Sequence, residues 1–237
     1  TRSAFVTGVQ TCALPILVEA IGNLASVAAF SAFDISDYSA TDRCFRFALW
    51  CASESGSWAL RANTLAEMAR KAAYLGAYDD ALSLIEFAYV RADRVSATAR
   101  AMLWTVRAQL LSLLNRPAES ISDVARADDY FQQSDPATDP PWLSYYTLAE
   151  HQGSTGKALI PIARAEKRVE LAAPRLRSAI EAHGQDFPRS RAFSQVRLAA
   201  LEMNVGNSAE AVQVGRRAVE QASGDRKSTR LNSSHER

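Results

Sequence analysis

The chain has 237 residues, of which 27 are basic, 26 are acidic and 48% are hydrophobic. A formal net charge of +1 is not the clustered positive charge that DNA or RNA binding needs, so we do not expect these residues to bind nucleic acid. No apolar run approaches the roughly 18–20 residues of a membrane span, which favours a cytoplasmic protein with no membrane contact.

The two ends of the chain are complementary at the codon level. Residues 6–16 read forwards and residues 225–235 read backwards have reverse-complementary codons available, as for Ile16 (ATC) and Asp225 (GAT). Both ends resemble one sequencing adapter translated on opposite strands. We therefore expect residues 1–16 and 225–237 to be artefacts, the first of them disordered or irregular. Residues 17–224 are then a natural segment whose neighbouring parts are missing, with a charge of about −2.

A short phrase recurs along the natural segment and indicates a helical repeat. The best copy begins Gly76-Ala77-Tyr78 and ends at Ala88, where a Gly ends one helix, a Tyr packs at the turn and a small residue sits where helices approach. The corresponding alanines are spaced 40, 39, 52 and 39 residues apart and are Ala48, Ala88, Ala127, Ala179 and Ala218. Together with abundant Ala and sparse Gly and Pro, this predicts an all-α, tetratricopeptide-like array of antiparallel helix pairs stacked as an α-solenoid.

About five helix pairs follow from the phrase in chain order. The first helices are predicted at residues 17–33, 58–75, 98–114, 142–152 and 190–205. The second helices are predicted at residues 38–53, 78–94, 117–133, 169–183 and 208–222, with Pro174 delaying or kinking the fourth of these. Cys44 and Cys51 then lie two turns apart on one helix, roughly 10 Å by helical rise, and cannot form a disulfide.

The stretch between residues 134 and 167 interrupts the repeat. Residues 135–141 contain three prolines and predict an extended linker, because a residue before Pro avoids the helical region. After the helix at 142–152 we expect a break at Gly153–Gly156, and then a short extra helix at residues 158–164. This insertion accounts for the spacing of 52 residues.

Two phrases in this region resemble a family of bacterial regulators. They are residues 139–146, Asp-Pro-Pro-Trp-Leu-Ser-Tyr-Tyr, and residues 149–159, which contain Gly153-Ser-Thr-Gly156-Lys157. In that family a lambda-repressor-type (Xre-like) helix-turn-helix domain precedes a long tetratricopeptide-like domain. The resemblance implies a transcriptional regulator whose DNA-binding domain lies upstream and is missing here. It also implies that the repeat domain senses a ligand or partner and mediates dimerisation, and that no residue here contacts DNA.

A groove is the best candidate site, because the concave face of such arrays is lined by fixed positions of the first helices. The turn alignment places ten residues there: Asn23, Ser26, Phe30, Asn63, Glu67, Arg70, Tyr74, Thr105, Gln109 and Ser112. Mixed polar and aromatic groups on one face can hold an extended or helical peptide. The alternative is that these residues only form the solvated side that every surface helix needs.

No residues suggest an enzyme, a metal site or a cofactor. Gly153–Lys157 lacks the first Gly and the hydroxyl residue of a phosphate loop, and no strand precedes it. His151 and His183 share no metal-ligand spacing, so we interpret them as surface or turn residues. The four tryptophans, at positions 50, 58, 104 and 142, are expected to pack between helices.

The predicted function is binding of a protein or peptide partner, or of a small ligand, by the repeat domain of a dimeric bacterial regulator. The alternative is a stand-alone scaffold that binds peptides and has no DNA role. The upstream coding sequence would distinguish the two.

Overall fold

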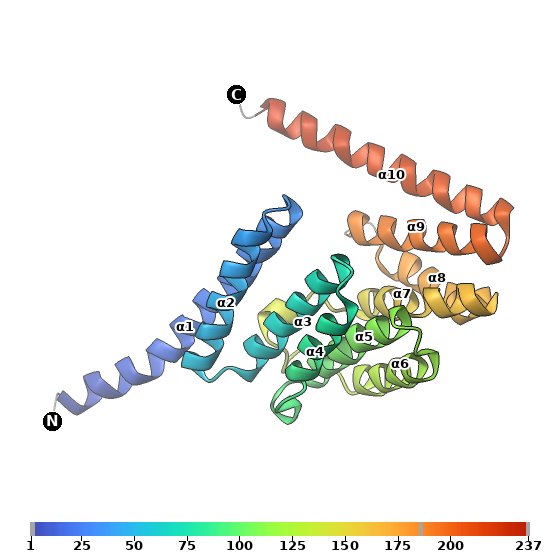
Figure 1. The fold of residues 1–237 in the computed structure, drawn as a ribbon. Helices are drawn as coiled ribbons and strands as arrows, with labels where there is room; N and C mark the ends of the chain where they lie inside the picture. The colour runs from blue at the N-terminus through green and yellow to red at the C-terminus, as the bar shows by residue number, and fades with distance from the viewer. Residues whose placement is uncertain (1–2, 185–186, 236–237) are drawn as a thin grey trace.

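A computed structural model describes residues 3–184 and 187–235, with side chains described over 13–184 and 187–221. The described residues contain only helices, turns and loops, with no strand, which confirms the all-α prediction. The helices follow one another across the molecule in chain order (Figure 1). Their bounds are α1 Ser3–Asp34, α2 Tyr38–Ser55, α3 Trp58–Tyr74, α4 Tyr78–Ala88, α5 Ala97–Leu113, α6 Pro117–Gln132, α7 Leu148–Glu166, α8 Ala173–Ala182, α9 Pro188–Val205 and α10 Ser208–His235.

Local sequence explains where these helices begin and end. The carboxylate of Asp37 accepts a hydrogen bond from the Ala40 amide (2.9 Å) at the start of α2, and Ser57 and Ser96 cap α3 and α5 in the same way. After α2 and α3 the chain turns at Gly56 and Gly76, which have φ angles of 67° and 82° in the left-handed region that Gly adopts without strain.

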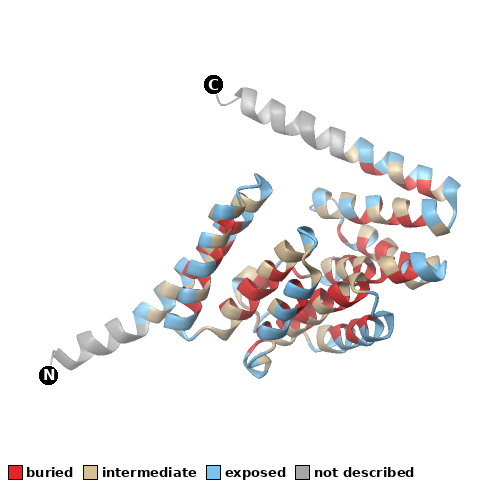
Figure 2. Cartoon of the chain, viewed as in Figure 1, coloured by how far each residue is buried: buried red, intermediate tan, exposed pale blue. Residues whose placement is uncertain are grey.

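Consecutive helices pack most extensively on each other, as α1 with α2, α3 with α4, α5 with α6, α7 with α8 and α9 with α10. The first helices of these pairs also contact one another in series, from α1 to α3, α5, α7 and α9. An inner layer of α3, α5 and α7 therefore runs through the molecule, and its residues are among the most buried (Figure 2).

The small residues of the repeat phrase lie where the sequence predicted them. The five alanines that define the spacing are between 0% and 3% exposed, so each permits close approach of two helices: Ala48, Ala88, Ala127, Ala179 and Ala218. Larger side chains fill the remaining space, among them Ile85, Met102, Leu103, Leu176 and Leu198.

The prediction around residues 142–164 is wrong. Residues Pro141–Leu143 form only a 3₁₀ turn, and α7 begins at Leu148 and continues to Glu166 through Gly153 and Gly156. The two glycines do not break the helix because they serve close packing. A Cβ atom on Gly156 would lie 3.0 Å from Leu176 Cδ2 and 3.2 Å from Arg175 Cβ, both on α8.

Three smaller differences concern helix ends. The fourth helix ends at Ala88 rather than residue 94, since Arg91 has a φ of 62° and the chain continues as a 3₁₀ turn. The helix predicted from residue 169 begins at Ala173, because Pro174 occupies its first turn, where the missing N–H costs nothing. The first helix, predicted from residue 17, begins at Ser3, and the last helix, predicted to end at residue 222, reaches His235. Extension of an existing helix adds one hydrogen bond per residue and needs no new nucleus.

One segment corrects the prediction that no apolar run could span a membrane. Residues Ala13–Asp34 of α1 are long and apolar enough to do so by length and composition, a test that a soluble core helix or a signal sequence also passes. Gly22, Ala25 and Ala29 are buried, while the other side of α1 exposes Leu24 and Val27.

Candidate ligand-binding groove

Two adjoining cavities open on the inner layer between α1, α3, α5 and α7. Their volumes are about 280 Å³ and 350 Å³. We call the first the apolar cavity, because Phe33, Phe45, Leu110 and Leu113 line it, and the second the polar cavity. Six residues line both and form a shared wall: Phe30, Glu67, Arg70, Val106, Gln109 and Lys157. The two cavities therefore make one continuous groove.

Six of the ten predicted groove residues line these cavities. Phe30, Glu67, Arg70 and Gln109 belong to the shared wall, Tyr74 lines only the apolar cavity, and Thr105 lines only the polar one. The structure thus brings together predicted side chains from α1, α3 and α5 that are up to 79 positions apart in the chain.

Four predicted residues do not line the groove. The Ser26 hydroxyl lies 3.3 Å from that of Thr64, so it joins α1 to α3 instead of facing a ligand. Asn63 and Ser112 are 8% and 5% exposed. Asn23 is half-buried, and its amide oxygen is enclosed. These positions lie on the sides of the helices that meet neighbouring helices.

Six residues of the polar cavity were not predicted from the sequence: Val106, Tyr145, Glu150, Ser154, Lys157 and Arg197. Three of them are on α7 at positions i, i+4 and i+7, which is the spacing of one helical face. That signal was present in the sequence, but the break predicted at Gly153–Gly156 divided the helix and hid it.

The Glu67 carboxylate forms the floor of the groove. It is 5% exposed and forms an ion pair with Arg70, one turn further along α3. Burial raises the pKa of Glu67, and the attraction of Arg70 partly offsets that increase. Its Oε1 atom accepts the hydrogen bond from Arg70, whereas its buried Oε2 atom has no hydrogen-bond partner among the described residues.

Lys157 approaches the same groove from α7. Desolvation, reinforced by the positive charges of Arg197 and Arg70, lowers the pKa of this ammonium group to about 8, and Glu150 opposes the change. Over the described side chains Lys157 forms no ion pair or hydrogen bond. The Glu150 carboxylate instead accepts a hydrogen bond of 2.7 Å from Ser154.

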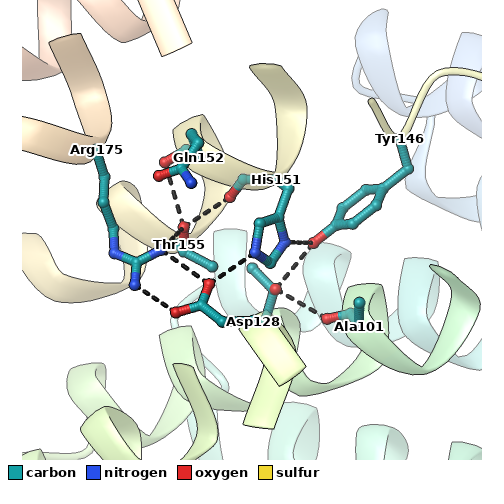
Figure 3. Close-up of polar contacts among 8 residues, drawn as sticks. Ala101, Asp128, Tyr146, His151, Gln152, Thr155 and Arg175 are labelled. Carbon is teal, nitrogen blue, oxygen red and sulfur yellow. Dashed lines mark hydrogen bonds and ion pairs between the residues drawn. The ribbon is translucent and has the colours of Figure 1, made fainter. Parts of the chain in front are cut away.

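The neighbouring face of α7 carries a largely buried network of polar contacts (Figure 3). His151 Nε2 lies 2.8 Å from Asp128 Oδ1, and Arg175 Nη2 donates to Asp128 Oδ2 over 2.5 Å. His151 Nδ1 lies 3.2 Å from the Tyr146 hydroxyl, which is 2.9 Å from the Thr105 hydroxyl. The network joins α5, α6, α7 and α8.

This network corrects the interpretation of both histidines as surface or turn residues. His151 is 1% exposed and stacks on Phe131 with ring centroids 4.3 Å apart, and His183 is 5% exposed. The burial of His151 is possible because Asp128 and Tyr146 provide partners for its two ring nitrogens. Within residues 13–184 and 187–221, no three His, Cys, Asp or Glu side chains lie where they could share a metal ion.

The Gly153–Lys157 segment is part of α7, so its backbone amides point along a helix and do not form a phosphate-binding loop. Trp58 and Trp142 pack partly buried against the core of α3, α4 and α5, whereas Trp50 is 53% exposed, so the expected packing between helices is wrong for Trp50. Trp104 stands half-buried beside Tyr89, with ring centroids 4.7 Å apart.

The groove thus offers an apolar compartment, a buried carboxylate oxygen and two cationic groups, Lys157 and Arg197, that form no ion pair among the described side chains. Such a surface can bind a ligand by complementary contacts. No protein-family model matches the chain, and neither a search of curated proteins nor one of solved structures finds a similar protein.

Proposed function

We propose that this chain is a tetratricopeptide-like helical repeat module that binds a peptide segment of a partner protein in the groove. The observation that carries the proposal is the groove itself. Two adjoining cavities on the inner layer are lined by Phe30, Glu67, Arg70 and Gln109, which the repeat alignment independently predicted. Repeat arrays expose such continuous inner surfaces because each unit contacts only its neighbours.

The mixed chemistry of the groove supports a peptide as the ligand. A peptide supplies backbone donors and acceptors at regular intervals together with apolar side chains, and the groove has a polar part beside an apolar one. A small ligand with the same groups is the alternative occupant.

A test is selection of peptides from a displayed random library against the whole chain, followed by affinity measurements on variants. Gln109→Trp would fill the shared wall of both cavities. We expect it to weaken the selected peptides by about tenfold or more, equivalent to about 1.4 kcal/mol. Gln132→Trp is the matched control, because Gln132 is an exposed residue of α6 outside the groove. Failure to select any peptide, or equal binding to both variants, would contradict the proposal.

We further propose that the module belongs to a cytoplasmic, dimeric bacterial transcription regulator whose helix-turn-helix domain lies upstream. The support is the resemblance of residues 139–146 and 149–159 to that family. Recovery of the upstream coding sequence tests it: a helix-turn-helix domain is expected, whereas a catalytic or membrane domain would refute it. An upstream segment that holds only further repeats would favour the alternative, a stand-alone peptide-binding scaffold. Light scattering on the purified chain tests the dimer.

A further inference from the structure

The exposed side of α1 is almost entirely apolar and carries no charged residue between positions 17 and 31. Seven residues on the side opposite the buried Gly22 and Ala29 form what we call the α1 stripe: Leu17, Ala20, Ile21, Leu24, Val27, Ala28 and Ser31. All seven are exposed, the four large side chains by 40% to 68%. Positions that recur every three or four residues lie on one face of a helix, so the stripe is continuous.

The α1 stripe has the repeat of a seam between two helices. Its members are separated by seven residues in three sets, which are Leu17, Leu24 and Ser31; Ala20 and Val27; and Ile21 and Ala28. A seven-residue repeat of this kind keeps one face of a helix against a second helix along its length. Helices α2 and α3 already contact the other side of α1. A helix on the stripe would therefore come from outside the fold.

The two ends of the array differ in the surface that they present to solvent. The last helix, α10, exposes Gln213, Arg216, Arg217 and Glu220, which is the polar surface that a terminal repeat needs for solubility. The first helix exposes the α1 stripe instead. A contiguous apolar surface marks an interaction site. The surface of α1 is therefore that of a helix inside an array, which another helix covers.

The α1 stripe is complementary to itself when two copies run antiparallel with a two-fold axis at Leu24. The facing pairs are then Leu17 with Ser31, Ala20 with Ala28, and Ile21 with Val27. A large side chain meets a small one at each end, and the alanines allow close approach. Ser31 brings no unsatisfied hydroxyl into the seam, because its Oγ atom already donates to the Val27 carbonyl over 3.2 Å.

A parallel pair fits less well. It would place Leu17 against Leu17 at one end and Ser31 against Ser31 at the other, so large and small side chains would not alternate. It would also bring the two copies of Asp34 to the same end of the seam. The antiparallel pair separates these carboxylates and opposes the two helix dipoles.

A membrane surface also fits this helix less well than a second copy does. Residues 17–55, which include the natural part of α1 and all of α2, have five acidic residues against two basic ones: Glu19, Asp34, Asp37, Asp42 and Glu54 against Arg43 and Arg46. Helices that lie on membranes are rich in Lys and Arg and are attracted to anionic lipids, which this hairpin would repel. Two uncharged stripes meet without burying any charge.

We infer that two copies of this chain associate through their α1 stripes, which run antiparallel with the two-fold axis at Leu24. Each copy then covers the apolar surface of the other. The inference rests on the proposed dimer and assigns it a surface.

Sedimentation equilibrium of the whole chain measures the association. A single pair of helices is a small interface, so we expect the mass to rise towards twice 25.8 kDa only as the concentration approaches about 100 µM. Leu24→Asp places a charge at the centre of the seam and should weaken the association by about tenfold or more. Ile121→Asp is the matched control, because Ile121 is 44% exposed on α6, and it should change nothing. Circular dichroism should show equal helix content in all three proteins, since both sites are exposed.

Paired charges test the antiparallel arrangement. Leu17→Glu should weaken the association by about tenfold, and the addition of Ser31→Lys should restore most of it. The new carboxylate of one copy then lies against the new ammonium group of the other, at both ends of the seam. A parallel pair would bring like charges together in the double variant. Failure of the second substitution to restore the association would therefore overturn the antiparallel arrangement.

The other outcomes separate this inference from the proposed function. A monomer at every concentration would overturn both the inference and the proposed dimer, and a dimer that Leu24→Asp does not weaken would overturn the inference alone. A monomer that floats with vesicles of phosphatidylcholine and phosphatidylglycerol would assign the α1 stripe to a membrane. Leu24 lines neither cavity of the groove, so peptides selected for the groove should bind Leu24→Asp and the wild type equally.

Discussion

The polar groups on the two faces of α7 differ in how completely they are hydrogen-bonded. On one face, His151, Asp128 and Arg175 satisfy each other within 3.0 Å, and the Tyr146 and Thr105 hydroxyls extend the network. On the other face, Lys157 of α7 and the enclosed Oε2 atom of Glu67 on α3 form no hydrogen bond with any side chain that the structure describes. The same helix therefore carries a complete polar network and an incomplete one.

The difference shows which face stabilises the fold and which one serves binding. A complete buried network holds neighbouring helices in one arrangement, whereas local rules are broken mainly where a ligand can complete them. Variants on the two faces should then change stability in opposite directions.

Asp128→Ala breaks the complete face. It leaves His151 and Arg175 without their shared carboxylate, and removal of one partner from such a network costs about 3–5 kcal/mol. Urea denaturation of the wild type and the variant measures the loss. Asp93→Ala is the control, since Asp93 pairs with Arg91 at an exposed turn, and it should leave the midpoint unchanged. Equal effects of the two substitutions would mean that the network does not stabilise the fold.

Gly156→Val tests the packing beneath that network. The new side chain would meet Leu176 and Arg175 of α8, where even a Cβ atom lies at 3.0–3.2 Å. Overpacking of this kind costs about 1–3 kcal/mol, seen as a lower melting temperature in circular dichroism. Gly215→Val on α10 is the matched control, because its Cβ would meet only Ala199 at 3.7 Å. A neutral Gly156→Val would argue that α7 and α8 are further apart than the structure has them.

Acidification should measure the contribution of the Asp128 carboxylate to stability without a substitution that changes the side-chain packing. Burial alone would raise its pKa, but hydrogen bonds from His151 and Arg175, and the charge of Arg175, lower it from 3.8 to about 2. A depressed pKa contributes stability that is present above pH 3.8 and is lost as the pH falls towards 2, here about 2 kcal/mol. Urea midpoints measured across this range should fall more steeply for the wild type than for Asp128→Asn. Parallel curves would contradict the assignment.

Lys157→Met should stabilise the chain while it removes a charge from the groove. The pKa of Lys157 is lower in the folded state than in the unfolded state, so folding opposes protonation, and the cost is present below about pH 8. Replacement by an apolar side chain of similar length should raise the free energy of unfolding by about 1 kcal/mol at neutral pH. Arg164→Met, on the exposed side of the same helix, should not. A loss of stability in Lys157→Met would show that the charge is satisfied after all.

The helical framework was largely predictable because its signals are local. The repeat phrase places a small residue at each helix crossing, and Ser57 and Ser96 mark helix starts next to apolar periodic segments. The predicted helix at residues 58–75 accordingly differs from α3, Trp58–Tyr74, by one residue.

The polar half of the groove was not predictable in this way. In the sequence, a Gly that breaks a helix looks the same as a Gly that allows a neighbouring helix to approach. For Gly156 the position of Leu176 on α8 shows that the second reading is the right one. His151 likewise bonds to Asp128, 23 positions away in the chain, and Asp128 in turn pairs with Arg175, 47 positions further along. Such pairings depend on tertiary packing, which no local pattern records.

Tyr145 and Tyr146 are adjacent in the chain but serve different environments. Tyr145 lines the polar cavity, while the hydroxyl of Tyr146, 3% exposed, reaches the buried His151 ring and the hydroxyl of Thr105, a residue that also lines this cavity. A single peptide unit therefore links the mouth of the groove to the interior, and a ligand that draws Tyr145 inwards must also pull on the hydroxyl of its neighbour. A displacement of one of these two tyrosines is therefore transmitted to the other through the backbone. Binding of a ligand in the groove should then change the rates of amide hydrogen exchange in α6 and α8, neither of which lines the groove.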